Sequence, residues 1–258
     1  MSSASPRCAL LLYGLPKYFQ GVSYPSIVDR IVRHVRVPVD IFVHTYDVRT
    51  TTNPRNGEAQ CPLYPEEALT CTPVAWRLEA SQDRVDADLD PLFHALCAYG
   101  DAWSNGFVSL RNALRQYHSI NGAYALMAAH VHSTGRPYAM VIASRMDMLY
   151  LDDLAVEVLQ RGEPGANDIY LPDFHEFGGV NDRFAAGGPE AMRVYCQARL
   201  DWTVAFCADR ARAMHSESFL AWRLAAAPAV RVHKMRFRLR RIRANGYIHD
   251  AELLVTGW

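Results

Sequence analysis

The sequence predicts an α/β fold in which a mostly parallel sheet carries helices on both faces. Residues 138–143 (YAMVIA) form a short apolar run bounded by polar residues, which is typical of a strand buried on both faces. Residues 8–46 show strand, helix and strand patterns in succession, and such a βαβ unit indicates parallel strands. No internal repeat, low-complexity tract or linker divides the sequence, so a single domain is expected over residues 1–258.

The N-terminal part of the sequence supplies three predicted strands and one helix. Residues 8–13 (CALLLY) are a continuous apolar run, and residues 27–35 carry apolar side chains at helical spacing. Residues 39–46 predict the second strand, which ends in polar side chains. Residues 50–73 are rich in Thr, Asn, Pro and Gly, and they predict a loop or insertion with little regular structure. Residues 74–78 (VAWRL) predict a short third strand.

The middle of the chain predicts the longest helix and the central strand. Residues 83–101 are acidic with apolar gaps and predict a helix, and residues 109–132 show the longest helical pattern. The run at 138–143 follows as the central strand. After it, residues 156–159 predict a short helix and residues 168–172 (DIYLP) predict a further strand.

The C-terminal part combines helix-start signals with a basic, alternating tail. Proline in the first turn marks one helix start, and alternation of basic with apolar residues indicates a strand with a basic face. The predicted elements are a helix from 187–190 that runs on towards Arg212, a helix over 217–226 capped by Ser216, a strand over 230–242 and a hairpin turn at 244–246.

Composition argues against several classes of protein. Lys plus Arg and Asp plus Glu both total 27, so charge argues against a dedicated nucleic-acid-binding protein. The six cysteines form no C-x-x-C pair, which predicts buried thiols in a reducing compartment and neither disulfides nor a zinc site. No apolar run reaches the length of a membrane span, and the run at 8–12 is too short for a signal peptide. We therefore expect a soluble, cytoplasmic protein.

Polar clusters follow the predicted strand ends. Because parallel strands place their carboxyl ends at one edge of a sheet, where open α/β sheets bind ligands, these clusters are expected to converge. Burying charged groups costs free energy, so Arg145 and Asp147, at the end of an apolar strand, are expected to contact a ligand or a metal, or to form an ion pair with one another. The four clusters lie at residues 14–18, 44–47, 145–147 and 173–183.

The chemistry of these clusters suits a sugar diphosphate. An arginine or a divalent ion neutralises the phosphates, and a free carboxylate accepts a proton from the second substrate. Asp147 offers hard oxygen ligands of the kind that magnesium or manganese prefers. The standard phosphate loops G-x-x-x-x-G-K-[ST] and G-x-G-x-x-G are absent, and so is the nucleophile elbow G-x-S-x-G.

Five segments carry a resemblance to a known family: CALLLYG, IFVHTYD, YAMVIASRMDMLYL, GGVNDRFAAGGPEAMRVY and HSESFLAWRL. They resemble the small GT-A glycosyltransferases, and the Arg145-Met146-Asp147 form is similar to that of capsule and viral glycan-assembly relatives. In this family the carboxylates of a D-x-D motif bind a metal and the donor diphosphate. Here Arg145 stands at the first position, where it can replace part of the cation's role. The resemblance implies a GT-A-like, Rossmann-related fold.

The resemblance also implies a function. It implies a hexosyl- or pentosyltransferase that moves a sugar from a nucleotide-sugar, a UDP-sugar being favoured, to a hydroxyl of an oligosaccharide or glycoprotein glycan. A divalent cation, Mn²⁺ or Mg²⁺, would bind at Asp147. The donor-binding residues it implies are Gly14, Leu15, His44, Thr45, Gln116, Arg145 and Asp147. Two other classes stay open, namely an inactive nucleotide-sugar- or glycan-binding module and a nucleotidyltransferase on a similar fold.

An inverting transfer needs a carboxylate that accepts the proton of the attacking hydroxyl. Asp182 is the first choice because its glycine-rich segment lets a ligand approach the backbone, and Glu217 is the second catalytic candidate. Glu176 and His215 follow. The structural alternatives are a local ion pair between Asp182 and Arg183, and Glu217 stabilising a helix N-terminus. A retaining enzyme needs no such base, and both outcomes stay open.

Overall fold

The structure is a computed structural model that describes residues 5–53, 57–154, 164–197 and 199–248. It contains a seven-stranded sheet in which only β9 runs antiparallel to its neighbours. The predicted fold class, an α/β protein with a mostly parallel sheet and helices on both faces, is confirmed. In spatial order the strands are β10 (Arg231–Met235), β8 (Asp168–Pro172), β9 (Phe184–Gly187), β6 (Met140–Arg145), β1 (Cys8–Tyr13), β2 (Val39–Tyr46) and β5 (Ala75–Glu79).

The central strand is β6, as the apolar run at 138–143 predicted. It pairs with β1 in parallel and with β9 in antiparallel register, so both of its edges are covered. Its first five residues are all buried. Burial on both faces removes the need for polar alternation, which explains the continuous apolar sequence.

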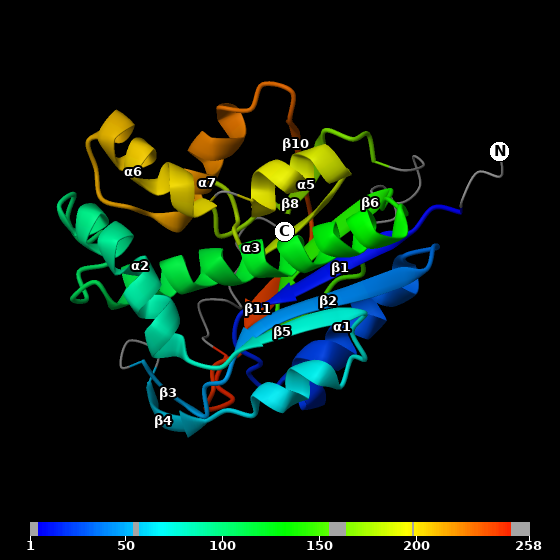
Figure 1. The fold of residues 1–258 in the computed structure, drawn as a ribbon, viewed down its shortest axis with the longest axis horizontal. Coiled ribbons are helices and arrows are strands. Elements are labelled where there is room, and N and C mark those ends of the chain that lie inside the picture. Colours follow the sequence, from blue (N-terminus) through cyan, green and yellow to red (C-terminus); the bar gives the residue numbers. More distant parts are fainter. Residues whose placement is uncertain (1–4, 54–56, 155–163, 198, 249–258) are drawn as a thin grey trace.

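Two apolar layers sandwich the sheet. Along β1, Leu10 and Leu12 belong to one core cluster, whereas Ala9 and Leu11 belong to the other, because side chains alternate between the faces of a strand. Figure 1 shows α3 (Val108–Thr134) lying along one face and α1 (Tyr24–Arg30) on the other. The single π-helical turn η1 (Phe19–Ser23) and the 3₁₀ turn η2 (Val32–His34) flank α1.

The remaining helices gather on the α3 side. α5 packs against α3, β6 and α7, and α2 and α6 pack against one another and against α3. Their bounds are α2 (Gln82–Cys97), α5 (Pro189–Cys196), α6 (Arg199–Arg210) and α7 (Ser216–Ala225). None of the helices in the described ranges has the length and apolar character required to cross a membrane.

Residues 50–73 differ from the predicted loop, and that prediction was wrong. β3 (Thr50–Asn53) and β4 (Glu58–Pro62) form an antiparallel hairpin, followed by the 3₁₀ turn η4 (Pro65–Leu69). Glu58 anchors the hairpin because its buried carboxylate accepts hydrogen bonds from Lys17 and from the backbone of Ala244. These partners are distant in sequence, so turn-rich local composition did not reveal the hairpin.

The C-terminal elements are shorter than predicted. The helix from Pro189 ends at Cys196 because Gln197 adopts an extended conformation, and α6 then begins at Arg199. The tail divides into β10, which is an edge strand, and β11 (Leu239–Arg241), which pairs with β7 (Met148–Tyr150) in a separate small sheet. His215, and not Ser216, occupies the N-cap position of α7. The helix predicted at 156–159 lies outside the described residues.

Candidate functional site

A cavity of about 850 Å³ opens at the carboxyl edge of the sheet. Residues that follow β1, β2 and β6 line it together with one face of α3 and the first turn of α7, as expected for a parallel sheet. Glu58 and part of β3 form its opposite wall. Of the predicted site residues, the cavity brings together Gly14, Leu15, Gln116, Arg145, Asp147, Asp182 and Glu217.

Arg145 and Asp147 form a two-point ion pair at the end of β6. The Arg145 Nε lies 2.8 Å from Asp147 Oδ1, and its Nη2 lies 2.6 Å from Oδ2. Burial alone would raise the pKa of the Asp147 carboxyl, but the Arg145 guanidinium outweighs burial and lowers that pKa to about 2. The sequence offered a ligand or a mutual ion pair as alternatives; the structure shows the ion pair, and it lines the cavity.

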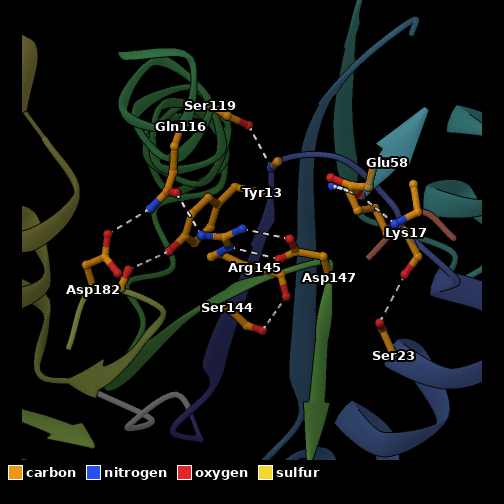
Figure 2. A network of polar contacts seen from close by, with 12 residues as sticks. Tyr13, Lys17, Ser23, Glu58, Gln116, Ser119, Ser144, Arg145, Asp147 and Asp182 are labelled. Carbon is orange, nitrogen blue, oxygen red and sulfur yellow. Dashed lines mark hydrogen bonds and ion pairs between the residues drawn. The ribbon is translucent and has the colours of Figure 1, made fainter. Parts of the chain in front are cut away.

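Gln116 connects this ion pair to Asp182, as Figure 2 shows. Its Oε1 accepts a hydrogen bond of 3.0 Å from Arg145 Nη1, and its Nε2 donates to Asp182 Oδ2 at 3.4 Å. The Tyr13 hydroxyl donates to the backbone carbonyl of Asp182 at 3.4 Å. Side chains from α3, β6 and the segment before β9 are thereby held in one chain of contacts.

The surroundings of Asp147 do not fit a hard divalent cation. Both carboxylate oxygens accept hydrogen bonds from Arg145, and the positive charges of Lys17 and Arg241 also lie close enough to lower the pKa of Asp147. Mg²⁺ and Ca²⁺ are bound by sets of oxygen ligands and not by one carboxylate among cations. The expected role of Asp147 as a metal ligand is therefore not favoured by the arrangement, and we derive no step through a metal there.

Glu217 is a cavity carboxylate whose acidity is strongly perturbed. Burial, together with the negative charge of Asp182, raises the pKa of Glu217 to about 7. The Nδ1 of His215 lies 3.6 Å from Glu217 Oε2, and the His215 ring stacks on Trp103 with centroids 5.6 Å apart. The backbone carbonyl of Glu217 accepts a hydrogen bond from Val180, which fixes the first turn of α7 against the glycine-rich segment.

His44 and Thr45 differ from the expectation that they contact the donor. Neither side chain lines the cavity, and both are buried. His44 points towards α3, where Gly122 leaves room for its ring, and Thr45 points to the opposite face of the sheet. Glu176 also lies elsewhere, because it pairs with Lys234 on β10.

Several residues that line the cavity were not among the individual site residues that the sequence predicts. Lys17 makes a buried ion pair with Glu58, with Nζ 2.7 Å from Oε1. Trp103 and the exposed Phe177 also line the cavity. Arg241 at the end of β11 brings a further cation to the same wall. Lys17 and Phe177 fall within the polar clusters predicted at 14–18 and 173–183, whereas Trp103 and Arg241 reach the cavity through the packing of distant segments.

The fold and the cavity define a class of protein: an α/β protein with a polar cavity at the carboxyl edge of its sheet. No protein-family model matches the chain, and no curated protein matches its sequence. Among solved structures, the chain is similar to mouse xyloside xylosyltransferase 1 in its apo form. The identity is 12%, the match covers 89% of this chain and 84% of that chain, and the TM-score is 0.36. A likeness this weak does not define a function for the chain.

Proposed function

We propose that the chain is a glycosyltransferase that transfers a sugar from a nucleotide-sugar, a UDP-sugar being favoured, to a hydroxyl of a glycan. The proposal treats residues 1–258 as one domain. The observation that carries it is that one polar cavity is lined both by the Arg145–Asp147 ion pair and by Glu217, whose pKa is raised to about 7. A positive cluster beside a carboxylate poised near neutrality suits departure of a diphosphate and activation of a hydroxyl.

The donor diphosphate is assigned to the cationic wall of the cavity. Lys17, Arg145, Arg241 and Arg243 all line it. Positive groups fixed in place before the reaction stabilise the negative charge that develops on the leaving diphosphate. In this proposal they supply the neutralisation that Mn²⁺ or Mg²⁺ would otherwise provide, and the nucleoside lies against Gly14 and Leu15.

The acceptor hydroxyl is assigned to the side of Glu217. Its oxygen attacks the anomeric carbon, the bond from that carbon to the diphosphate oxygen breaks, and Glu217 takes the hydroxyl proton. A base works best when its pKa lies near the working pH, and Glu217 meets this condition, so we assign it the role for which Asp182 is the first choice from the sequence. Asp182 then acts through its charge, which contributes to the raised pKa of Glu217. This route inverts the anomeric centre.

The test is transfer from a panel of nucleotide-sugars to glycan acceptors, using wild type, Glu217→Gln and Glu190→Gln. Glu190 lies in the first turn of α5 and does not line the cavity, so it is the matched control. We expect Glu217→Gln to lower the transfer rate by about 100-fold or more with donor affinity unchanged. A normal rate in Glu217→Gln would exclude it as the base.

Two outcomes would replace the proposal altogether. Thermal stabilisation by a nucleotide-sugar without turnover, for any acceptor, would indicate a binding module. Such a module is consistent with an Asp147 whose oxygens are both bonded to Arg145. Turnover of a nucleoside triphosphate with a sugar phosphate would indicate a nucleotidyltransferase.

A further inference from the structure

Three side chains with metal-binding atoms meet behind the cavity wall. His44 on β2, Glu79 at the end of β5 and His118 on α3 each bring one such atom to within 4.8 Å of the others. None of the three lines the cavity. We propose that they form a binding site for a divalent transition-metal ion of the zinc class.

The hydrogen bonds around Ser119 orient His44 for this role. The Ser119 hydroxyl donates to the backbone carbonyl of His44 at 2.9 Å and accepts from the backbone N–H of Gly14 at 2.9 Å. The same hydroxyl lies 3.1 Å from His44 Nδ1 and so holds that ring nitrogen in place. In the tautomer with its hydrogen on Nδ1, Nε2 carries the lone pair that a metal ion needs.

The Tyr46 hydroxyl orients His118 in the same way. It donates to the carbonyl of Arg115 at 2.6 Å and lies 3.0 Å from His118 Nδ1. Because the hydroxyl proton is used, it accepts from Nδ1–H, and the Nε2 of His118 keeps its lone pair. Partners that hold the second ring nitrogen and fix the tautomer are the usual support of metal-binding histidines.

Two of the three ligand atoms already face one another. The Nε2 of His44 lies 3.1 Å from Glu79 Oε1, and His118 brings the third ligand atom to within 4.8 Å of both. A metal ion shared by the two nitrogens and the oxygen satisfies all three groups.

The ligand set selects the kind of metal. Two imidazole nitrogens and one carboxylate oxygen suit zinc and its transition-metal neighbours, whereas magnesium and calcium prefer oxygen ligands. His44 is fully buried, but His118 and Glu79 are partly exposed, so an ion can enter from their side. Zinc holds its ligand atoms at about 2.0–2.2 Å. The two ligand atoms that lie farthest apart must therefore approach one another by roughly 1 Å when the ion binds.

The neighbouring charges act in both directions. Arg77, two residues before Glu79 on β5, places a positive charge near both histidines, and Asp88 places a negative charge near His118. A bound ion would tie the edge strand β5 to α3. The hydroxyl of Ser119 also accepts a hydrogen bond from the backbone N–H of Gly14, so the bound ion would stiffen the rim of the cavity as well.

The test is zinc binding to the whole protein after dialysis against a chelator, measured by competition with a chromophoric chelator. We expect one tight zinc per chain in wild type. His118→Ala and Glu79→Gln should each weaken binding at least tenfold, and Tyr46→Phe should weaken it by about 10- to 100-fold through loss of the His118 support. His132→Ala, at an exposed position of α3, is the matched control and should bind as wild type does.

A second measurement does not depend on any variant folding. Cobalt added to the wild-type protein should give the visible absorption bands of a tetrahedral site with nitrogen and oxygen ligands. Absence of these bands together with absence of zinc binding at micromolar protein would overturn the proposal. So would wild-type affinity in His118→Ala and Glu79→Gln. Loss of zinc binding in Asp147→Asn would also overturn it, because the ion would then lie in the cavity.

Discussion

Asp147 is held by two parallel hydrogen bonds from Arg145, at 2.8 and 2.6 Å, at the point where the central strand ends. Such charge-assisted, two-point pairs combine strength with a fixed geometry. The pair is largely buried, with side-chain exposures of 19% for Arg145 and 9% for Asp147, so water screens it weakly. Its consequences can therefore be measured in stability as well as in activity.

The first prediction concerns stability in acid. The pKa of Asp147 falls from the ordinary 3.8 to about 2 in the folded protein, which corresponds to about 2 kcal/mol of stabilisation. A lowered acid pKa stabilises the fold fully above pH 4, and this contribution is lost as the pH falls through 2. We expect the stability difference between wild type and Asp147→Asn in denaturant titrations to narrow by that amount between pH 5 and 2. The exposed Asp201→Asn serves as control, and a constant difference for Asp147→Asn would refute the assignment.

The second prediction concerns stability near neutral pH. The pKa of Glu217 is raised from 4.5 to about 7, so the folded protein holds this proton more tightly than the unfolded chain does. The free energy of unfolding of the wild type therefore falls by about 3 kcal/mol as the pH rises from 4.5 through 7, whereas that of Glu217→Gln does not. Between pH 4.5 and 8 we expect the stability of Glu217→Gln, measured by urea unfolding, to rise by this amount relative to the wild type. An equal pH dependence in the two proteins would mean that Glu217 ionises normally.

The third prediction concerns the pH dependence of transfer. Glu217 accepts a proton only when it is ionised, so the rate should rise with pH and level off above about 7. Replacing Asp182 by Asn removes a negative charge that helps to raise this pKa, and the rise should move to lower pH. The measurement is kcat/KM against pH for wild type and Asp182→Asn. An unmoved midpoint in Asp182→Asn would show that the two carboxylates do not interact.

The sequence predicted the parts of the fold whose signals are local. The strands predicted at 8–13, 39–46 and 168–172 coincide with β1, β2 and β8, and most of their residues are buried. The convergence of Gly14 and Arg145 followed from parallel topology alone. Features that depend on distant partners were not predictable in this way.

His44 and Glu58 illustrate that limit. The polar cluster at the end of the strand and the family resemblance predict His44 at the donor site, but strand alternation does not tell which face of β2 meets α3, and His44 faces the helix. Glu58 lies in a turn-rich stretch and became part of the cavity wall through a buried pair with Lys17. The raised pKa of Glu217 likewise arises from burial and from Asp182, which only the folded chain brings near.

The fourth prediction tests the hairpin anchor. Lys17→Met removes the ammonium group that pairs with the buried Glu58 carboxylate, and breaking a buried ion pair typically costs about 3–5 kcal/mol. The double variant Lys17→Met with Glu58→Gln also removes the carboxylate charge that Lys17 balances and should recover part of that loss. Urea unfolding of the four proteins in this cycle gives the coupling between the two residues. Additive effects would show that the pair does not hold the hairpin.

The fifth prediction concerns the contact that places Glu217. A methyl group at Gly179 would overlap the backbone carbonyl of Glu217, and neither backbone can move freely because Val180 donates a hydrogen bond to that carbonyl. We expect Gly179→Ala to destabilise the protein by about 1–3 kcal/mol, as overpacking does, and to slow transfer because the base is displaced. Gly21→Ala is the matched control, since a methyl group there meets no atom within 4 Å. The measurements are thermal unfolding and the transfer rate of both variants. Wild-type values for Gly179→Ala would mean that the start of α7 is not held against the glycine-rich segment.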